Sequence, residues 1–109
     1  MIECTARELS ELLDERDTFT LFLYTPLCGT CKLTERMLEV IEAIKDDHEL
    51  KLFKSNVNLS PELCRSWKVT SVPCIVNVYN GKPTGMLYRM QSVDTLYKWI
   101  MNEKEYDHG

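Results

Sequence analysis

The chain has 109 residues, of which 44% are hydrophobic and 28% are charged, so its length and composition predict one globular domain over residues 1–109. Its 13 Lys and Arg against 17 Asp and Glu give a net charge of −4, and because the basic residues are scattered, a nucleic-acid partner is not expected. The longest apolar stretch is too short to span a bilayer, and charge at the third residue is unlike a signal peptide, so we expect a cytoplasmic protein with no membrane partner.

Helix and strand patterns alternate from the first residues onward. Residues 2–4 are compatible with a short strand, and Thr5-Ala6-Arg7-Glu8 has the form of a capping box, which begins a helix that we expect to end near Arg16. Residues 18–25 carry no charge and are rich in aromatic, β-branched and leucine side chains. They predict a strand that is covered on both faces.

The middle of the chain continues this alternation. Pro26 ends the uncharged strand, and apolar residues then recur at helical intervals from Cys28 to a polar break at residues 46–48. Residues 50–57 predict another strand, and Ser60-Pro61-Glu62 predicts a short helix with the serine as its cap and the proline at the first helical position. Cys28 is therefore expected where a strand turns into a helix.

The last third of the chain predicts a hairpin and a helix. Residues 74–79 and 86–90 are strand candidates on either side of Asn80-Gly81, a dipeptide typical of tight turns, so the two strands should be antiparallel neighbours. An amphipathic helix is expected from Ser92, followed by a polar C-terminal tail at about residues 102–109. The order of the elements predicts an α/β fold, with a central mixed sheet and helices on both faces.

Two of the five cysteines form the segment Cys28-Gly29-Thr30-Cys31. A helix N-terminus stabilises a thiolate through its free N–H groups and its dipole, so Cys28 is a candidate nucleophile. The spacing puts Cys31 one turn further on, where its thiol can attack a mixed disulfide at Cys28 and release the reduced substrate. Cys-x-x-Cys is also common in metal sites, and the pattern alone leaves both interpretations open.

Nearly the whole chain resembles the thioredoxin family. The resemblance rests on the hydrophobic strand before Cys28-Gly29-Thr30-Cys31-Lys32, on Lys54 in the next strand, on Ser71-Val72-Pro73, and on the strand that ends in Asn80-Gly81-Lys82. It implies the thioredoxin fold and a thiol–disulfide oxidoreductase activity that needs no cofactor. The partners it implies are disulfide-containing proteins or small thiols and a cellular reductant, and we expect a monomer.

The resemblance also implies roles for individual residues. Cys28 would be the exposed nucleophile and Cys31 the more buried resolving thiol. Pro73 matches the family's cis-proline, which orients the substrate backbone. Lys54 matches a lysine beneath the redox pair that modulates its ionisation, although a solvated strand lysine is an alternative interpretation. The residues that would bind substrate are Leu27, Gly29, Thr30, Val72 and Pro73.

Several positions depart from the family pattern. Leu27 stands where thioredoxins have Trp and Thr30 where they have Pro, which bears on substrate contact and redox potential. Phe22 stands where thioredoxins bury an acid that helps to deprotonate the resolving thiol, and no neighbouring acid obviously replaces it. Arg89 replaces the glycine preferred near the substrate surface, so a bulky charge could narrow the docking groove.

Two other functions stay open at this point. A metal or iron–sulfur protein would use the same thiols, but Cys28, Cys31 and Cys74 provide fewer ligands than the four of a closed zinc site, so no metal-binding residue is assigned. The other alternative is a catalytically weak binding module that keeps the scaffold. Cys74 is interpreted as a small core residue in preference to a regulatory thiol, and Cys4 and Cys64 indicate packing only.

Overall fold

The computed structural model describes residues 1–44, 50–90 and 92–106. The elements follow in the order β1 (Ile2–Glu3), α1 (Ala6–Asp14), β2 (Phe19–Tyr24), α2 (Gly29–Ile44), β3 (Leu52–Asn56), a 3-10 turn (Val57–Leu59), α3 (Pro61–Ser66), β4 (Cys74–Tyr79), β5 (Lys82–Leu87) and α4 (Val93–Tyr106). Among the described residues, no helix combines the length and the apolar character needed to cross a membrane.

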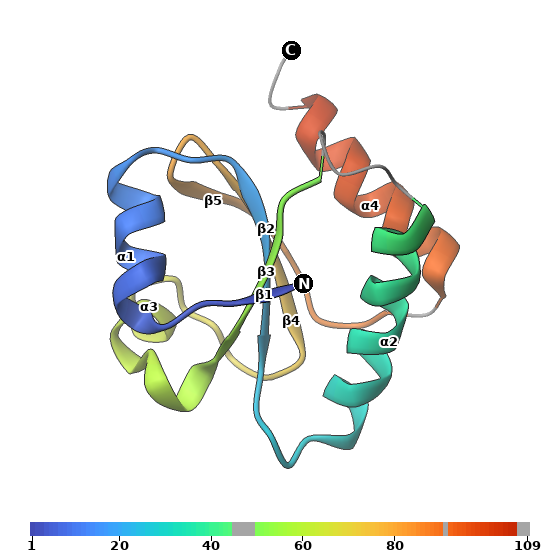
Figure 1. The fold of residues 1–109 in the computed structure, drawn as a ribbon, viewed down its shortest axis with the longest axis horizontal. Coiled ribbons are helices and arrows are strands. Elements are labelled where there is room, and N and C mark those ends of the chain that lie inside the picture. The colour runs from blue at the N-terminus through green and yellow to red at the C-terminus, as the bar shows by residue number, and fades with distance from the viewer. Residues whose placement is uncertain (45–49, 91, 107–109) are drawn as a thin grey trace.

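The strands form one mixed sheet in the order β1-β3-β2-β4-β5. β3 is parallel to both β1 and β2, whereas β4 is antiparallel to both β2 and β5. Figure 1 shows the sheet in the middle of the molecule, with α1 and α3 on one side and α2 and α4 on the other. This arrangement confirms the predicted α/β class with helices on both faces of a mixed sheet.

The central strand β2 divides two apolar clusters, because its successive side chains point to opposite faces. All residues from Phe19 to Leu23 are buried, which confirms a strand covered on both sides. The α2/α4 cluster consists of Phe22, Cys31, Leu38, Ile41, Leu50, Leu52, Ile75, Leu96 and Ile100. The α1/α3 cluster consists of Leu9, Phe19, Leu21, Leu23, Cys74, Val76 and Val78.

The first helix begins as predicted and ends slightly earlier. The Thr5 hydroxyl accepts a hydrogen bond from the Glu8 backbone N–H (3.1 Å), and the Glu8 carboxylate accepts one from the Thr5 N–H (3.0 Å), so the capping box is formed. α1 ends at Asp14 because Arg16, with φ of 58°, has left the helical region. The polar break predicted at residues 46–48 lies outside the described residues.

The second strand of the hairpin was predicted too late in the chain. Asn80 and Gly81 have φ of 54° and 80°, so the chain reverses within two residues and the strand starts directly after them. β5 therefore spans Lys82–Leu87 and not residues 86–90. Pro83 is tolerated within it because β5 is an edge strand, where a residue without an N–H need not break a ladder.

Two helix ends also differ from the prediction. Ser60 occupies the N-cap position of α3, but its hydroxyl makes no capping bond, because ψ of 54° is far from the extended conformation of a capping residue. Its Oγ is buried without a hydrogen-bond partner. At the other end of the chain, α4 continues to Tyr106, so the segment predicted as a tail from residue 102 is helical up to that residue.

Candidate active site

The two cysteines of the Cys-x-x-Cys segment lie at the junction of β2 and α2. A turn closes this junction, since the Cys28 N–H donates to the Thr25 carbonyl at 3.2 Å, and the Cys28 carbonyl accepts from the Lys32 N–H at 3.3 Å. The sulfur atoms of Cys28 and Cys31 are joined as a disulfide, with the Cα atoms 5.1 Å apart. The pair therefore sits on the N-terminus of a helix of 16 residues, where the dipole favours negative charge.

The two sulfur atoms differ in their access to solvent. Cys28 is partly exposed, whereas Cys31 is 2% exposed and belongs to the α2/α4 cluster, which also contains Phe22 and Ile75. A partner molecule can therefore reach the first sulfur directly. The second cysteine is almost inaccessible to a partner molecule.

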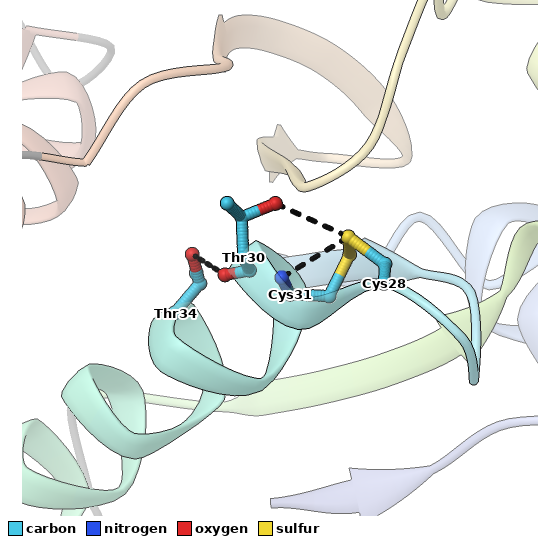
Figure 2. Close-up of a disulfide and its surroundings, with 4 residues drawn as sticks. All are labelled: Cys28, Thr30, Cys31 and Thr34. Carbon is cyan, nitrogen blue, oxygen red and sulfur yellow. Dashed lines mark hydrogen bonds between the residues drawn. A yellow bond between two sulfur atoms is a disulfide. The ribbon is translucent and has the colours of Figure 1, made fainter.

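Hydrogen-bond donors surround the more exposed sulfur. Figure 2 shows the Thr30 hydroxyl and the Cys31 backbone nitrogen directed at the Cys28 Sγ, at 3.2 and 3.1 Å. The Thr30 carbonyl in turn accepts a hydrogen bond from the Thr34 hydroxyl at 3.0 Å. Donors at this position stabilise a thiolate on Cys28 once the disulfide is reduced.

A groove runs beside the dithiol. The Val72–Pro73 peptide bond is cis, and Pro73 lines a cavity of about 250 Å³ together with Thr30 and Arg89. Val72 packs against the α2/α4 cluster. Thr30 at the start of α2 and Pro73 just before β4 thus meet at one surface, and Arg89 lies on its wall as the sequence suggested.

Three of the predicted substrate residues, Leu27, Gly29 and Val72, are not part of the lining of that cavity. Leu27 is 98% exposed, and a Cβ atom added to Gly29 would meet nothing within 4 Å. Both precede Thr30 on the turn that carries the dithiol. They form an open rim that leaves Cys28 accessible.

A second group of polar side chains connects α2 with the strands β1, β2 and β3. The Lys54 Nζ is 3.3 Å from the Glu35 carboxylate and 5.7 Å from the centroid of the Tyr24 ring. The Tyr24 hydroxyl donates to the Glu3 carboxylate at 2.7 Å. Burial, together with the hydrogen bond and charge of Glu3, raises the pKa of Tyr24 to about 12, so this phenol stays protonated at neutral pH.

Glu35 was not among the site residues predicted from the sequence, although its spacing carried a signal. It lies four residues after Cys31, which places both on one face of α2. Lys54 is opposite Phe22 in the sheet register, so the carboxylate it binds comes from α2 and not from β2. Through Glu35, Lys54 is therefore connected to α2, the helix that begins at the redox pair, and its effect on the ionisation of the pair stays a prediction.

The remaining cysteines lie apart from the dithiol. Cys74 is fully buried in the α1/α3 cluster, on the face of the sheet opposite Cys31, and burial raises the pKa of its thiol to about 11. Cys4 is buried as well and Cys64 is partly exposed, and both are free thiols. Within residues 1–44, 50–90 and 92–106, no three His, Cys, Asp or Glu side chains gather as metal ligands.

Comparisons with known proteins agree with this geometry. The family described as Thioredoxin matches residues 1–102. The thioredoxin-like protein YusE of Bacillus subtilis is 37% identical over 100 residues, which cover 92% of this chain and 91% of the length of YusE. A thioredoxin of Griffithsia pacifica is 24% identical over 96 residues, covering 83% of this chain and 85% of its own. Among solved structures, a mutant thioredoxin from Halobacterium salinarum is similar with a TM-score of 0.77 and 20% identity, over 94% of this chain and 88% of its own.

Proposed function

Because the chain belongs to the thioredoxin family, we propose that it catalyses thiol–disulfide exchange on protein or small-molecule disulfides, with Cys28 as the attacking and Cys31 as the resolving thiol. One observation carries this proposal. The two sulfur atoms share a helix N-terminus, yet one is partly exposed among hydrogen-bond donors and the other is 2% exposed. This asymmetry suits a division between attack and resolution.

In the proposed reaction, the Cys28 thiolate attacks one sulfur of a substrate disulfide. The substrate S–S bond breaks, a mixed disulfide forms, and the leaving thiolate takes up a proton. Cys31 then loses its proton and attacks the Cys28 sulfur, which forms the intramolecular disulfide and expels the second substrate sulfur as a thiolate. The substrate gains two electrons, and a cellular dithiol or another thiol reductant returns the protein to its reduced form.

We propose that substrate lies along Leu27, Gly29, Thr30, Val72 and Pro73. The exposed Leu27 offers an apolar contact, and the cavity between Thr30 and Pro73 can receive a side chain next to the scissile disulfide. We further propose a monomer acting in the cytoplasm. The three free thiols beside the single disulfide are compatible with a reducing compartment.

Catalysed reduction of insulin disulfides by dithiothreitol tests the proposal. The wild type should accelerate the reaction, and Cys28→Ser should not exceed the uncatalysed rate because the attacking thiol is gone. Cys64→Ser is the matched control, since it removes a partly exposed thiol far along the chain and should keep the wild-type rate. An inactive wild type, or an active Cys28→Ser variant, would exclude the proposed function.

The division of roles has its own test. Cys31→Ser should still attack substrates but should not release them, so mixed disulfides on Cys28 should accumulate. Cells expressing this variant are lysed in acid to stop thiol exchange, and the protein is separated with and without reductant. Adducts that disappear on reduction are expected for Cys31→Ser and not for a Cys28→Ser/Cys31→Ser control, and their absence from the first would contradict the assignment.

A further inference from the structure

A second cavity borders Cys31, the more buried cysteine of the dithiol. It has a volume of about 310 Å³, and its lining includes both Cys31 and Glu35. It is separate from the Pro73 groove, because the two cavities share no lining residue. Cys31 is otherwise surrounded by the apolar side chains of the α2/α4 cluster. The wall of this cavity therefore brings polar side chains next to Cys31.

The proposed function requires Cys31 to give up a proton. Only a thiolate attacks a disulfide efficiently, and an apolar environment disfavours the thiolate. Phe22 belongs to the same buried cluster as Cys31, and its side chain can accept no proton. The acceptor has to come from elsewhere, and the polar wall of this cavity is the nearest source.

The groups around Cys31 can be compared by their chemistry. Lys32 and Arg36 on α2 are cations, and Lys54 on β3 is a cation paired with Glu35. Tyr24 on β2 is a phenol that stays protonated, and Glu3 on β1 accepts its hydroxyl proton in a hydrogen bond. The buried side chains that α4 contributes to the cluster, Leu96 and Ile100, are apolar, and the titratable side chain that α4 packs against it, Tyr97, is a phenol and not a carboxylate.

Two carboxylates on the cavity wall, those of Glu35 and Glu39, remain as candidate proton acceptors. Glu35 lies one helical turn from Cys31, a rise of about 6 Å, whereas Glu39 lies two turns away, at about 12 Å. Glu35 is also held in place, since Lys54 binds its carboxylate at 3.3 Å and the two side chains are only 31% and 23% exposed. Glu39 is exposed and lies farther from the sulfur.

We propose that Glu35, positioned by Lys54, accepts the proton of Cys31 as this thiol attacks the mixed disulfide. The inference rests on the proposed function of the dithiol. In the step, the S–H bond of Cys31 breaks and its proton passes through the solvent-open cavity to the Glu35 carboxylate. The Cys28–Cys31 bond forms while the bond between Cys28 and the substrate breaks, and the substrate sulfur leaves with the electron pair. Glu35 later returns its proton to solvent.

A single-turnover experiment separates attack from resolution. Reduced protein is mixed in a stopped-flow instrument with a substoichiometric amount of dithiobis(nitrobenzoate), an aromatic disulfide whose thiolate is coloured. The first release of colour reports attack by Cys28, and the second reports resolution by Cys31. Both phases are recorded from pH 6 to pH 9 for the wild type, Glu35→Gln, Glu35→Asp and the control Glu39→Gln.

Glu35→Gln should leave the first phase unchanged and slow the second by roughly tenfold to a hundredfold at pH 7, because a proton acceptor has been removed. The deficit should shrink as the pH rises, since hydroxide can then remove the proton. Glu35→Asp should restore part of the rate, and Glu39→Gln should match the wild type in both phases. Lys54→Gln should slow only the second phase, by less than Glu35→Gln does.

Different results identify which claim fails. A second phase in Glu35→Gln as fast as in the wild type at pH 7, or a deficit that is equal at every pH, would overturn the role of Glu35 and leave the proposed function intact. Equal slowing in Glu39→Gln would also overturn it, because a general loss of negative charge would then explain the effect. A wild type without a second phase would overturn the proposed function itself.

Discussion

The Thr30 hydroxyl lies 3.2 Å from the sulfur of Cys28, so one of the two residues between the cysteines contacts the proposed nucleophile directly. The second donor to this sulfur is the backbone N–H of Cys31, at 3.1 Å. A proline in place of Thr30 would have no hydroxyl to offer. The hydrogen bond from the Thr30 side chain therefore stabilises the reduced, thiolate form of Cys28 more than it stabilises the disulfide form.

We predict that this contact makes the protein a weaker reductant than a typical thioredoxin. A more stable thiolate means a higher reduction potential, so we expect a value above the roughly −270 mV of thioredoxin and toward the −200 to −230 mV of glutaredoxins. Thr30→Val keeps the shape and removes the hydroxyl, which should lower the potential by about 30 mV, the equivalent of one charge-assisted hydrogen bond. Equilibration with glutathione buffers measures both values.

Thr30→Ser is the control for this prediction, because it keeps the hydroxyl and should keep the wild-type potential. Thr30→Pro should lower the potential at least as far as Thr30→Val. If the wild type were at or below about −270 mV, or if Thr30→Val equalled Thr30→Ser, the contact would have no effect on the redox equilibrium.

The thiol of Cys74 should be nearly inert at neutral pH. Burial raises its pKa to about 11, so at pH 8 only about one molecule in a thousand carries the reactive thiolate. Below this pKa the thiolate fraction rises tenfold for each pH unit, and alkylation by iodoacetamide should accelerate in the same proportion. Peptide mapping by mass spectrometry at pH 8 and pH 10 measures the rate. Rapid labelling of Cys74 at pH 8 in the folded protein would instead indicate a reactive, regulatory thiol.

Asn77 should contribute strongly to stability, because its buried side chain joins three elements. It accepts a hydrogen bond from the Thr20 hydroxyl on β2 at 2.8 Å and donates one to the Ile100 carbonyl on α4 at 3.3 Å. Asn77→Ala removes both bonds and should lower the free energy of unfolding by about 2 to 3 kcal/mol. Urea denaturation measures the change. Thr20→Val removes one bond and should cost less, so an equal or larger loss in that variant would contradict this account.

Gly81 should tolerate no side chain, whereas Gly29 should accept one. A Cβ atom on Gly81 would lie 2.6 Å from the Leu13 carbonyl oxygen and 3.1 Å from the Cα of Arg16, and its φ of 80° disfavours any residue with a Cβ. We expect Gly81→Ala to lower the free energy of unfolding by more than about 2 kcal/mol. Gly29→Ala lies in a helix with open space around it, so thermal unfolding should show no loss and a gain of up to about 1 kcal/mol.

Much of this protein could be predicted from local sequence patterns. The uncharged residues 18–25 contain the central strand, and Cys28 lies where this strand turns into a helix. Thr5 and Glu8 form the predicted capping box at the start of α1. Such features depend on interactions between residues close in sequence, which the chain carries in any context. The Cys28–Cys31 pair was likewise recognised from a local pattern, whereas the cis-proline position was implied by the resemblance to the thioredoxin family.

Contacts between distant segments depended on the tertiary structure. The pairing of Lys54 with Glu35 needs the register of β3 against β2 and the position of α2 above the sheet, and neither follows from spacing along the chain. Likewise, Cys74 and Ile75 alternate in any strand, but only the packing of α1 and α3 on one face and α2 on the other decides that Cys74 points away from the dithiol. The reactive sulfur could be read from the sequence because its helix end is local. The groups that we propose to take the proton of Cys31 could not be read from the sequence, because burial and sheet register bring them together, and the whole core sets both.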